Sequence, residues 1–309
     1  MTECERIIKE GILPESFFEE EIISGFKVTE ERKKLFAVLL DILLKIDSVC
    51  KKHNIKYFIH GGTLIGALRH GGIIPWDDDV DIAMFREDYE KFLSLSEEFA
   101  YPYFLQTPYT DEGFFWSNPA VRNCSTTAVS PFFAYQPMNH GAFVDIFVID
   151  NIVDGAAGKA NFERINQLSI DNSTYMRMSN PSLDEKNRKR VEEYKQRMRN
   201  PFEVYEEVHS LAQKFNDVPS EFVTTYTSTC YGFERELYYK EDFDDTVLVE
   251  FMGYKLPMPK GYERILKTTY DDYLKLPPVE ERGIHHNILF DMDTPYMEFI
   301  SREFPRKNS

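Results

Sequence analysis

Cysteine is scarce in this chain of 309 residues, and its four copies are scattered without a Cys-x-x-Cys pair. They indicate ordinary thiols in a reducing compartment and argue against a disulfide framework or a zinc site. Apolar runs of eighteen residues are also missing, and acids lie among the apolar residues near the N-terminus. We therefore expect neither a transmembrane helix nor a signal peptide. The expected location is the cytoplasm, with the inner face of the membrane as an alternative.

Basic residues are few in comparison with acidic ones. The chain has 36 Lys and Arg against 52 Asp and Glu, which gives a formal net charge of −16. This balance argues against a nucleic-acid partner, because nucleic-acid binding depends on a basic surface. Any anionic substrate must then be bound by metal ions and a few local basic groups. The aromatic content of 15% is high, which suits a substrate with a quaternary ammonium group.

The most informative stretch of the chain lies between residues 57 and 92. A short apolar run over residues 56–60 ends at Gly61 and Gly62, as a buried strand does where it enters a tight turn. Residues 63–68, beginning at Thr63, can then form a short helix. Its free N–H groups would lie beside the glycines, where they suit an anion such as a phosphate.

Four carboxylates follow Trp76 within this stretch: Asp77, Asp78, Asp79 and Asp81. On a strand, Asp79 and Asp81 would point to one face, while Val80 and Ile82 would enter the core. Two close carboxylates stay ionised together only if a cation lies between them. Hard oxygen ligands favour Mg²⁺ or Mn²⁺ over zinc. The alternative is a solvated acidic turn after the preceding proline.

A second acidic position lies inside an apolar segment. Residues 143–149 are a nearly continuous apolar run with one charge, Asp145, and predict a strand. A buried charge without a partner costs several kcal/mol, so we expect Asp145 to face a metal ion or another cation. An ion pair with an arginine is the alternative.

These residues resemble the LicD family of phosphorylcholine transferases, to which fukutin and fukutin-related protein are distantly related. The resemblance rests on four motifs: residues 61–64, 67–70, 74–82 and 88–89. It implies an α+β fold of the nucleotidyltransferase type, with a mixed sheet core flanked by helices and a mainly helical insertion. It also implies that Asp145 is a third carboxylate on a strand beside Asp79 and Asp81, and that His140 lies at the entry to that strand.

The resemblance also suggests how the chain is divided. It fades after residue 154 and resumes after 245, so we expect a catalytic core of residues 1–154 and 246–309 with a mainly helical, acceptor-side insertion of residues 155–245. Within the core, Thr29 can cap a helix over residues 30–53. Two residues depart from the family pattern: Met252 stands where the family usually has glutamate, and Asp271 where it has glycine.

By resemblance, the chain transfers phosphorylcholine from CDP-choline to a sugar hydroxyl and releases CMP. The acceptor would be a teichoic acid or related surface glycan precursor, expected to be lipid-linked. Asp79 and Asp81 would bind one or two Mg²⁺ ions, and Asp145 would share a metal and accept the proton of the acceptor hydroxyl. CDP-ribitol or CDP-glycerol as the donor stays open, as do an Asp-x-Asp glycosyltransferase and a non-catalytic acidic binding module.

The candidate donor-binding residues are Gly61, Gly62, Thr63, Arg69, Trp76, Trp116, Arg122, Tyr135, His140, His285 and His286. Arg122 suits a phosphate because a guanidinium can donate two parallel hydrogen bonds to it. Trp116, on a candidate strand over residues 114–123, and Tyr135, in the loop before Asp145, could form a cage for choline, although ordinary core packing is the alternative. Adjacent histidines point apart, so the 285–286 pair indicates substrate or structural contacts and not zinc.

One basic segment stands out in the acidic chain. Residues 186–199 carry seven Lys and Arg on a predicted helix. Such a charge run usually marks a solvated helix face. The alternative is a docking patch for an anionic acceptor polymer or a peripheral contact with the membrane surface.

Overall fold

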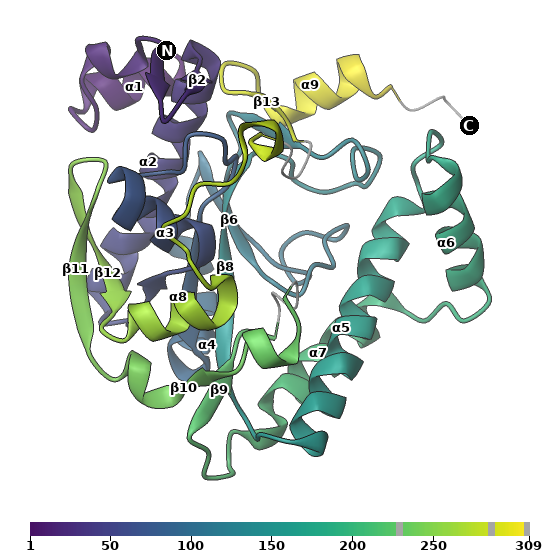
Figure 1. Ribbon diagram of the computed structural model, residues 1–309. Helices are drawn as coiled ribbons and strands as arrows, with labels where there is room; N and C mark the ends of the chain where they lie inside the picture. Colours follow the sequence, from purple (N-terminus) through teal and green to yellow (C-terminus); the bar gives the residue numbers. More distant parts are fainter. Residues whose placement is uncertain (227–230, 284–287, 306–309) are drawn as a thin grey trace.

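The computed structural model describes residues 1–226, 231–283 and 288–305. Its main feature is a mixed sheet of seven strands, flanked by helices, which confirms the α+β class (Figure 1). The seven strands are β3 (Phe58–Ile59), β4 (Asp81–Phe85), β5 (Tyr103–Gln106), β6 (Ala120–Asn123), β8 (Ala142–Ile152), β9 (Phe222–Thr224) and β10 (Tyr238–Tyr239). The long strand β8 is central, because β4 pairs with it in parallel while β6 and β9 pair with it in antiparallel.

The remaining strands form three small antiparallel pairs: β1 (Glu21–Ile23) with β2 (Phe26–Val28), β7 (Thr127–Val129) with β13 (Leu289–Asp291), and β11 (Thr246–Phe251) with β12 (Tyr254–Pro259). The α-helices are α1 (Glu3–Lys9), α2 (Glu30–His53), α3 (Gly61–His70), α4 (Arg86–Leu93), α5 (Ala156–Arg177), α6 (Glu185–Lys195), α7 (Pro201–Ala212), α8 (Tyr262–Tyr270) and α9 (Tyr296–Glu303). Short 3₁₀ turns are found at Glu15–Phe18, Ser96–Glu98, Gln213–Phe215, Phe233–Arg235, Lys240–Phe243 and Val279–Glu281.

Helix α2 covers one face of the central strands. It begins as predicted, because the Thr29 side chain accepts a hydrogen bond from the Arg32 N–H, and it ends at Asn54, whose φ is +51°. Its apolar face packs in one core cluster with Val144 and Ile146 of β8. The opposite face of β8 carries the intermediately exposed positions of its alternating pattern, of which Asp145 is one. Helix α2 therefore leaves that face to the functional site.

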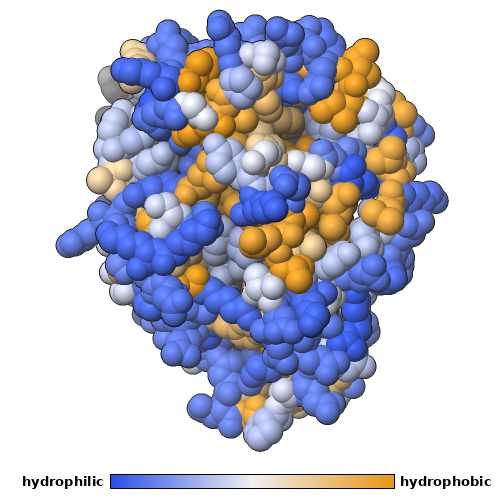
Figure 2. Space-filling view, turned by 90° about the vertical axis from the view of Figure 1, so that its left-hand side faces the viewer, coloured by the Kyte–Doolittle hydropathy of each residue, from blue (hydrophilic) through white to orange (hydrophobic). Residues whose placement is uncertain are grey.

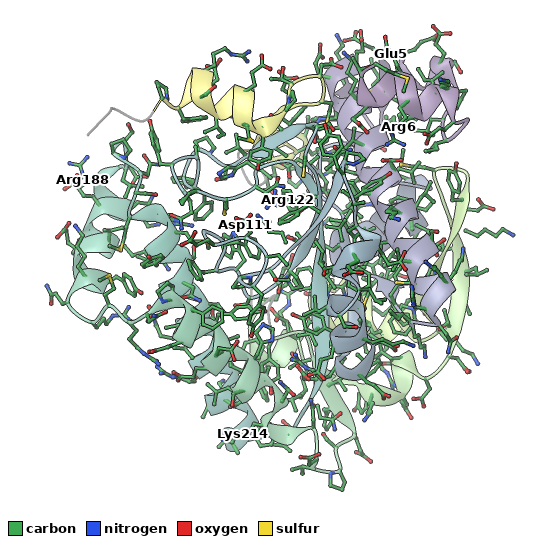
Figure 3. The ribbon with its side chains drawn as sticks, turned by 180° about the vertical axis from the view of Figure 1, so that it is seen from behind. Glu5, Arg6, Asp111, Arg122, Arg188 and Lys214 are labelled. Atoms are coloured by element: carbon green, nitrogen blue, oxygen red, sulfur yellow. The ribbon has the colours of Figure 1, made fainter. Side chains whose placement is uncertain are left out.

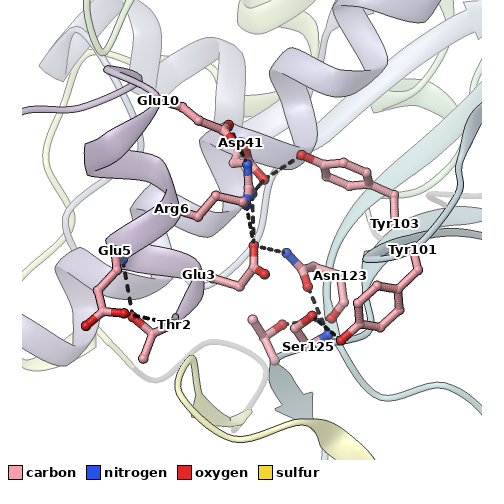
Figure 4. A network of polar contacts seen from close by, with 11 residues as sticks. Thr2, Glu3, Glu5, Arg6, Glu10, Asp41, Tyr101, Tyr103, Asn123 and Ser125 are labelled. Atoms are coloured by element: carbon pink, nitrogen blue, oxygen red, sulfur yellow. Dashed lines mark hydrogen bonds and ion pairs between the residues drawn. The ribbon is translucent and has the colours of Figure 1, made fainter.

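Helix α1 is joined to the core by a polar network (Figure 4). Arg6 lies 2.5 Å from Asp41 of α2 and 2.8 Å from Glu3, and Asn123 at the end of β6 donates to Glu3 at 3.1 Å. The buried carboxylate of Asp41 also accepts from the Tyr103 hydroxyl of β5. The network fixes α1 against α2, β5 and β6.

The predicted insertion, residues 155–245, is helical over much of its described length. Helices α5 and α7 pack together in a core cluster that includes Ile165, Val204 and Val208, and Figure 1 shows α6 projecting at the end of α5. However, β9 and β10 of the same range extend the central sheet. The division into a core and an acceptor-side insertion stays a prediction.

Part of the basic charge of residues 186–199 is balanced locally. Arg197 pairs with Asp171, Arg199 pairs with Glu207, and Lys195 lies 2.8 Å from Glu192. None of the helices in the described ranges is both long and apolar enough to cross a membrane. Figure 2 shows hydrophobic groups in several separate places on a mostly hydrophilic face. Contact of residues 186–199 with a membrane stays a prediction.

Asp271, which replaces the family's usual glycine, follows the last residue of α8 with φ +56° and ψ −107°. An L-residue is strained at positive φ, and the ion pair of Asp271 with Arg235 is long (3.6 Å) and exposed. We expect Asp271→Gly to raise the free energy of unfolding by about 1 kcal/mol, measured by urea denaturation. Asp272→Gly is the matched control and should lower stability; equal effects of the two changes would contradict the strain.

Candidate active site

Two of the predicted carboxylates lie side by side at the centre of the sheet. Asp81 begins β4, and its register partner on the parallel strand β8 is Asp145. Register partners on neighbouring strands direct their side chains to the same face. This face is the one opposite α2, and farther along the strands it is covered by a cluster that includes Phe147 and Ile265 of α8. The expectation that Asp145 lies on a strand beside Asp81 is confirmed.

Asp79 lies just before this strand. Val80 and Ile82 are fully buried, as predicted, while Asp79 and Asp81 are partly exposed. The prediction that the strand includes Asp79 was wrong, because β4 begins at Asp81. The antiparallel pairing of β3 with β4 ends with Ile59 opposite Ile82, followed by one hydrogen bond from the His60 N–H to the Asp81 carbonyl.

The glycines form the first turn of a helix. Helix α3 begins at Gly61, two residues before the predicted start, and Gly61 has φ +53°. A Cβ atom on Gly61 would lie 3.5 Å from Asp81 Oδ2, and one on Gly62 would lie 3.1 Å from Asp77 Oδ2. Both carboxylates therefore lie against the N-terminal turn of α3, whose positive end favours negative charge. Binding of a donor phosphate by this turn stays a prediction.

Thr63 connects α3 to the acidic segment. Its hydroxyl accepts a hydrogen bond of 2.8 Å from the Asp81 N–H, and the residue is 5% exposed. Thr63 therefore holds the first residue of β4 in place. Its predicted contact with the donor stays a prediction.

The four acidic residues do not have one role. Asp78 is 7% exposed, and Arg32 of α2 donates a 2.6 Å hydrogen bond to the Asp77 carbonyl. Burial lowers the pKa of Arg32, and the nearby charges of Asp78 and Asp77 oppose this shift. Asp78 therefore balances a partly buried guanidinium on α2, a contact that the sequence pattern did not reveal.

His60 is a site residue that the sequence analysis missed. It continues the pairing of β3 with β4 opposite Asp81, and its ring lies 5.3 Å from that of Phe147. Burial lowers the pKa of His60 to about 4, so the ring is neutral at physiological pH. The signal available in the sequence was its place directly before Gly61 and Gly62.

The chemistry of the donor set suits a hard cation. Within the described ranges, no three His, Cys, Asp or Glu side chains form a ready metal-binding cluster. Mg²⁺ does not need one, because it is usually bound by one or two carboxylates together with waters and substrate phosphates. Asp81 and Asp145 supply such a pair, since they are adjacent on one face. Metal binding by Asp79, Asp81 and Asp145 stays a prediction.

Arg122 lies on β6 opposite Phe143 of β8, and Figure 3 shows it near Asp111. Its guanidinium donates to the Gly141 carbonyl at 2.7 Å and to Gln106, and it lies 4.5 Å from the centroid of the Phe143 ring. Burial lowers the pKa of Arg122 to about 10. Some of its donors are thus used inside the protein, and phosphate binding stays a prediction.

Arg69 and Trp76 contribute to packing. Trp76 is 3% exposed, and two guanidinium groups lie near its ring, that of Arg69 at 5.8 Å and that of Arg282 at 4.8 Å from the centroid. Arg69 also donates to the carbonyls of Tyr273 and Lys275. These contacts join α3 to the segment after α8. Donor contacts of Arg69 and Trp76 stay predictions.

The two predicted cage aromatics lie in different surroundings. Residues 114–119 are not a strand, because β6 begins only at Ala120, after Pro119, which has no N–H to donate. The ring of Trp116 packs 5.1 Å from that of Phe133, and the ring of Tyr135 packs 5.8 Å from that of Phe304. A choline cage at Trp116 or Tyr135 stays a prediction.

His140 is buried, and its Nε2 lies 3.1 Å from the Gln136 carbonyl oxygen. It lines a cavity of about 690 Å³ that is closed on one side by α9, with Asp111, Met138 and Phe304 also in the lining. His140 lies two residues before β8, at the entry to that strand as expected, and its contact with the donor stays a prediction. His285 and His286 lie outside the described residues.

The comparisons with known proteins agree with this geometry. Residues 54–180 match the family model described as the nucleotidyltransferase domain of LicD/FKTN/FKRP. The chain is 28% identical over 274 residues to the lipopolysaccharide cholinephosphotransferase LicD of Haemophilus influenzae, covering 84% of this chain and 97% of that protein. It is 50% identical over 40 residues to the ribitol 5-phosphate transferase FKRP of Homo sapiens, covering 13% of this chain and 8% of that protein. The chain is therefore similar to the LicD family, and residues 54–180 are the part that matches its nucleotidyltransferase domain.

Proposed function

We propose that this protein transfers a substituted phosphate group from a CDP-alcohol to a hydroxyl of a glycan and releases CMP. The observation that carries the proposal is the pairing of Asp81 with Asp145 on one face of the sheet, beside the first turn of α3. The names of its relatives support it, since one is a cholinephosphotransferase and another is a ribitol 5-phosphate transferase.

In this proposal, Asp81 and Asp145 hold Mg²⁺ or Mn²⁺ together with Asp79. The bound ion would neutralise the diphosphate of the donor and the leaving CMP. The N–H groups of Gly61 and Gly62 at the start of α3 would contact a donor phosphate, because helix N-termini attract anions. Neutral His60 adds no positive charge of its own beside these groups.

Asp145 would also act as the base. It accepts the proton of the acceptor hydroxyl, whose oxygen then forms a bond to the phosphorus that carries the alcohol. The bond from that phosphorus to CMP breaks, and CMP leaves with the electron pair. The acceptor proposed is a sugar of a teichoic acid, lipopolysaccharide or related lipid-linked surface glycan, with residues 155–245 on the acceptor side.

For the donor, we propose CDP-choline first, with CDP-ribitol and CDP-glycerol as the second choice. The relative aligned over most of the chain is named for choline phosphate, whereas the one named for ribitol phosphate is aligned over 40 residues. A glycosyltransferase is a weaker alternative, because it leaves the pairing of Asp81 with Asp145 unexplained.

A competition assay tests this choice. The protein is incubated with Mg²⁺, a bacterial surface glycan and equal amounts of CDP-choline, CDP-ribitol and CDP-glycerol, and the alcohol phosphate attached to the glycan is identified by mass spectrometry. We expect attached phosphorylcholine and equimolar CMP, both lost with EDTA. Attachment of ribitol or glycerol phosphate would overturn the choline choice alone, and the absence of CMP release with all three donors would overturn the proposed reaction.

A further inference from the structure

Tyr270 lies next to the acidic site, although it is far from that site in the sequence. It is the last residue of α8, and the segment that contains it crosses the first turn of α3. A Cβ atom on Gly61 would lie 3.4 Å from the Tyr270 hydroxyl oxygen and 3.5 Å from Asp81 Oδ2. The two oxygens thus approach the same point above Gly61, where glycine leaves room for both.

The position of Tyr270 is fixed by its neighbours. The preceding residue, Thr269, is buried, and its hydroxyl lies 2.9 Å from the Tyr238 hydroxyl and donates to the Arg235 carbonyl at 3.0 Å. The ring of Tyr231 packs edge-on against the Tyr270 ring at 5.0 Å between centroids. These contacts hold the last turn of α8, and with it the Tyr270 side chain, in place.

The Tyr270 hydroxyl can act as a hydrogen-bond donor. A tyrosine phenol loses its proton only at a pH of about 10. The phenol therefore stays protonated at physiological pH. An ionised carboxylate can only accept hydrogen bonds, so the phenol is the partner that donates.

We propose that Tyr270 is a positioning residue, whose hydroxyl donates a hydrogen bond to the Asp81 carboxylate and holds it in the orientation that binds the divalent cation. This inference rests on the proposed function, because it takes Asp81 to be a metal ligand. Groups that hydrogen-bond to a metal ligand fix its direction, and their loss typically lowers metal affinity or activity 10- to 100-fold. This role goes beyond the acidic motif, because Tyr270 lies far from residues 77–81 in the sequence.

Tyr270→Phe tests the proposal, because it removes only the hydroxyl and keeps the ring packed against Tyr231. Binding of Mn²⁺ is measured without any substrate, from the loss of the free-ion signal in electron paramagnetic resonance. We expect the Kd for Mn²⁺ to rise about 10-fold, and the Mg²⁺ concentration for half-maximal CMP release to rise by a similar factor. Saturating Mg²⁺ should restore most of kcat, which a general loss of structure would not allow.

Tyr273→Phe is the matched control. It removes a tyrosine hydroxyl three residues farther on, and the Tyr273 carbonyl that accepts from Arg69 is unchanged. We expect wild-type Mn²⁺ affinity for this variant, and thermal unfolding curves of both variants that match the wild type. A Tyr270→Phe variant that unfolds like the wild type and binds Mn²⁺ with wild-type affinity would overturn the proposal.

The outcomes for Tyr270 and for the overall function are separable. If the wild type binds Mn²⁺ more tightly than Tyr270→Phe but releases no CMP from any CDP-alcohol, the positioning role stands and the proposed reaction fails. If transfer occurs but both proteins show the same metal dependence, the positioning role fails and the reaction stands. A wild type that binds no Mn²⁺ without substrate overturns the positioning role, and CMP release then tests the reaction separately.

Discussion

Replacing Asp81 or Asp145 by asparagine is expected to lower transfer at least about 100-fold while the fold persists. Asparagine keeps the size of the side chain but removes the charge that binds the cation, and at position 145 it also removes the base. Relief of repulsion between two adjacent carboxylates can even raise stability. The rate is measured as CMP released from CDP-choline at saturating Mg²⁺, and Asp79→Asn should show a similar loss.

Asp78→Asn is the control for this prediction. Asp78 belongs to the same acidic run but lies near Arg32 of α2, so its loss should affect stability more than the rate. Circular dichroism and thermal unfolding confirm that each variant is folded. Retention of more than about a tenth of the wild-type rate in Asp81→Asn would contradict the assignment of Asp81 as a metal ligand.

Asp150→Asn is expected to destabilise the protein by about 3–5 kcal/mol, the largest effect on stability that we predict. Asp150 is 1% exposed, accepts a 2.9 Å hydrogen bond from Arg86 Nε and a second from Arg86 Nη2, and also accepts from Asn216 at 2.7 Å. Asparagine leaves the Arg86 charge buried without its counter-ion. Urea denaturation with an unchanged m-value measures the loss.

Two further variants show whether burial is the cause. The exposed pair of Lys260 and Asp245 is also close, at 2.8 Å, so Asp245→Asn should change stability much less than Asp150→Asn does. Combining Asp150→Asn with Arg86→Met removes both charges and should recover part of the loss. Equal effects of Asp150→Asn and Asp245→Asn would be incompatible with a buried pair.

The parts of the site that depend on local pattern were predictable from the sequence. Alternation placed Val80 and Ile82 in the core, and the single charge in an apolar run marked Asp145 as a residue that faces a partner. The cap at Thr29 follows from its hydrogen-bonding side chain, and the apolar face of α2 follows from the helical period of 3.6 residues. Such features depend on residues that are close together in the sequence, so a single sequence is sufficient to predict them.

The remaining parts depend on contacts between distant segments. Nothing near Asp78 indicates Arg32, and nothing near Asp81 indicates Tyr270, because these contacts form only when α2 and α8 pack against the sheet. The predicted strand through Trp116 was wrong for a different reason: an aromatic run has strand propensity, but Pro119 delays the strand to Ala120. Strand propensity does not produce a strand where a proline leaves the backbone without an N–H donor.

The ion pair of Arg86 and Asp150 also bears on how freely the parts of this protein can be exchanged. Asp150 accepts from Asn216, and Arg86 lies 3.3 Å from His209 of α7, so the helical region supplies part of the surroundings of a charge on the central strand. A chimera that takes residues 155–245 from a relative must bring equivalents of Asn216 and His209, or it leaves those polar groups without their partners. We therefore expect this region to be inherited together with Arg86 and Asp150, as a matched set and not as an interchangeable module.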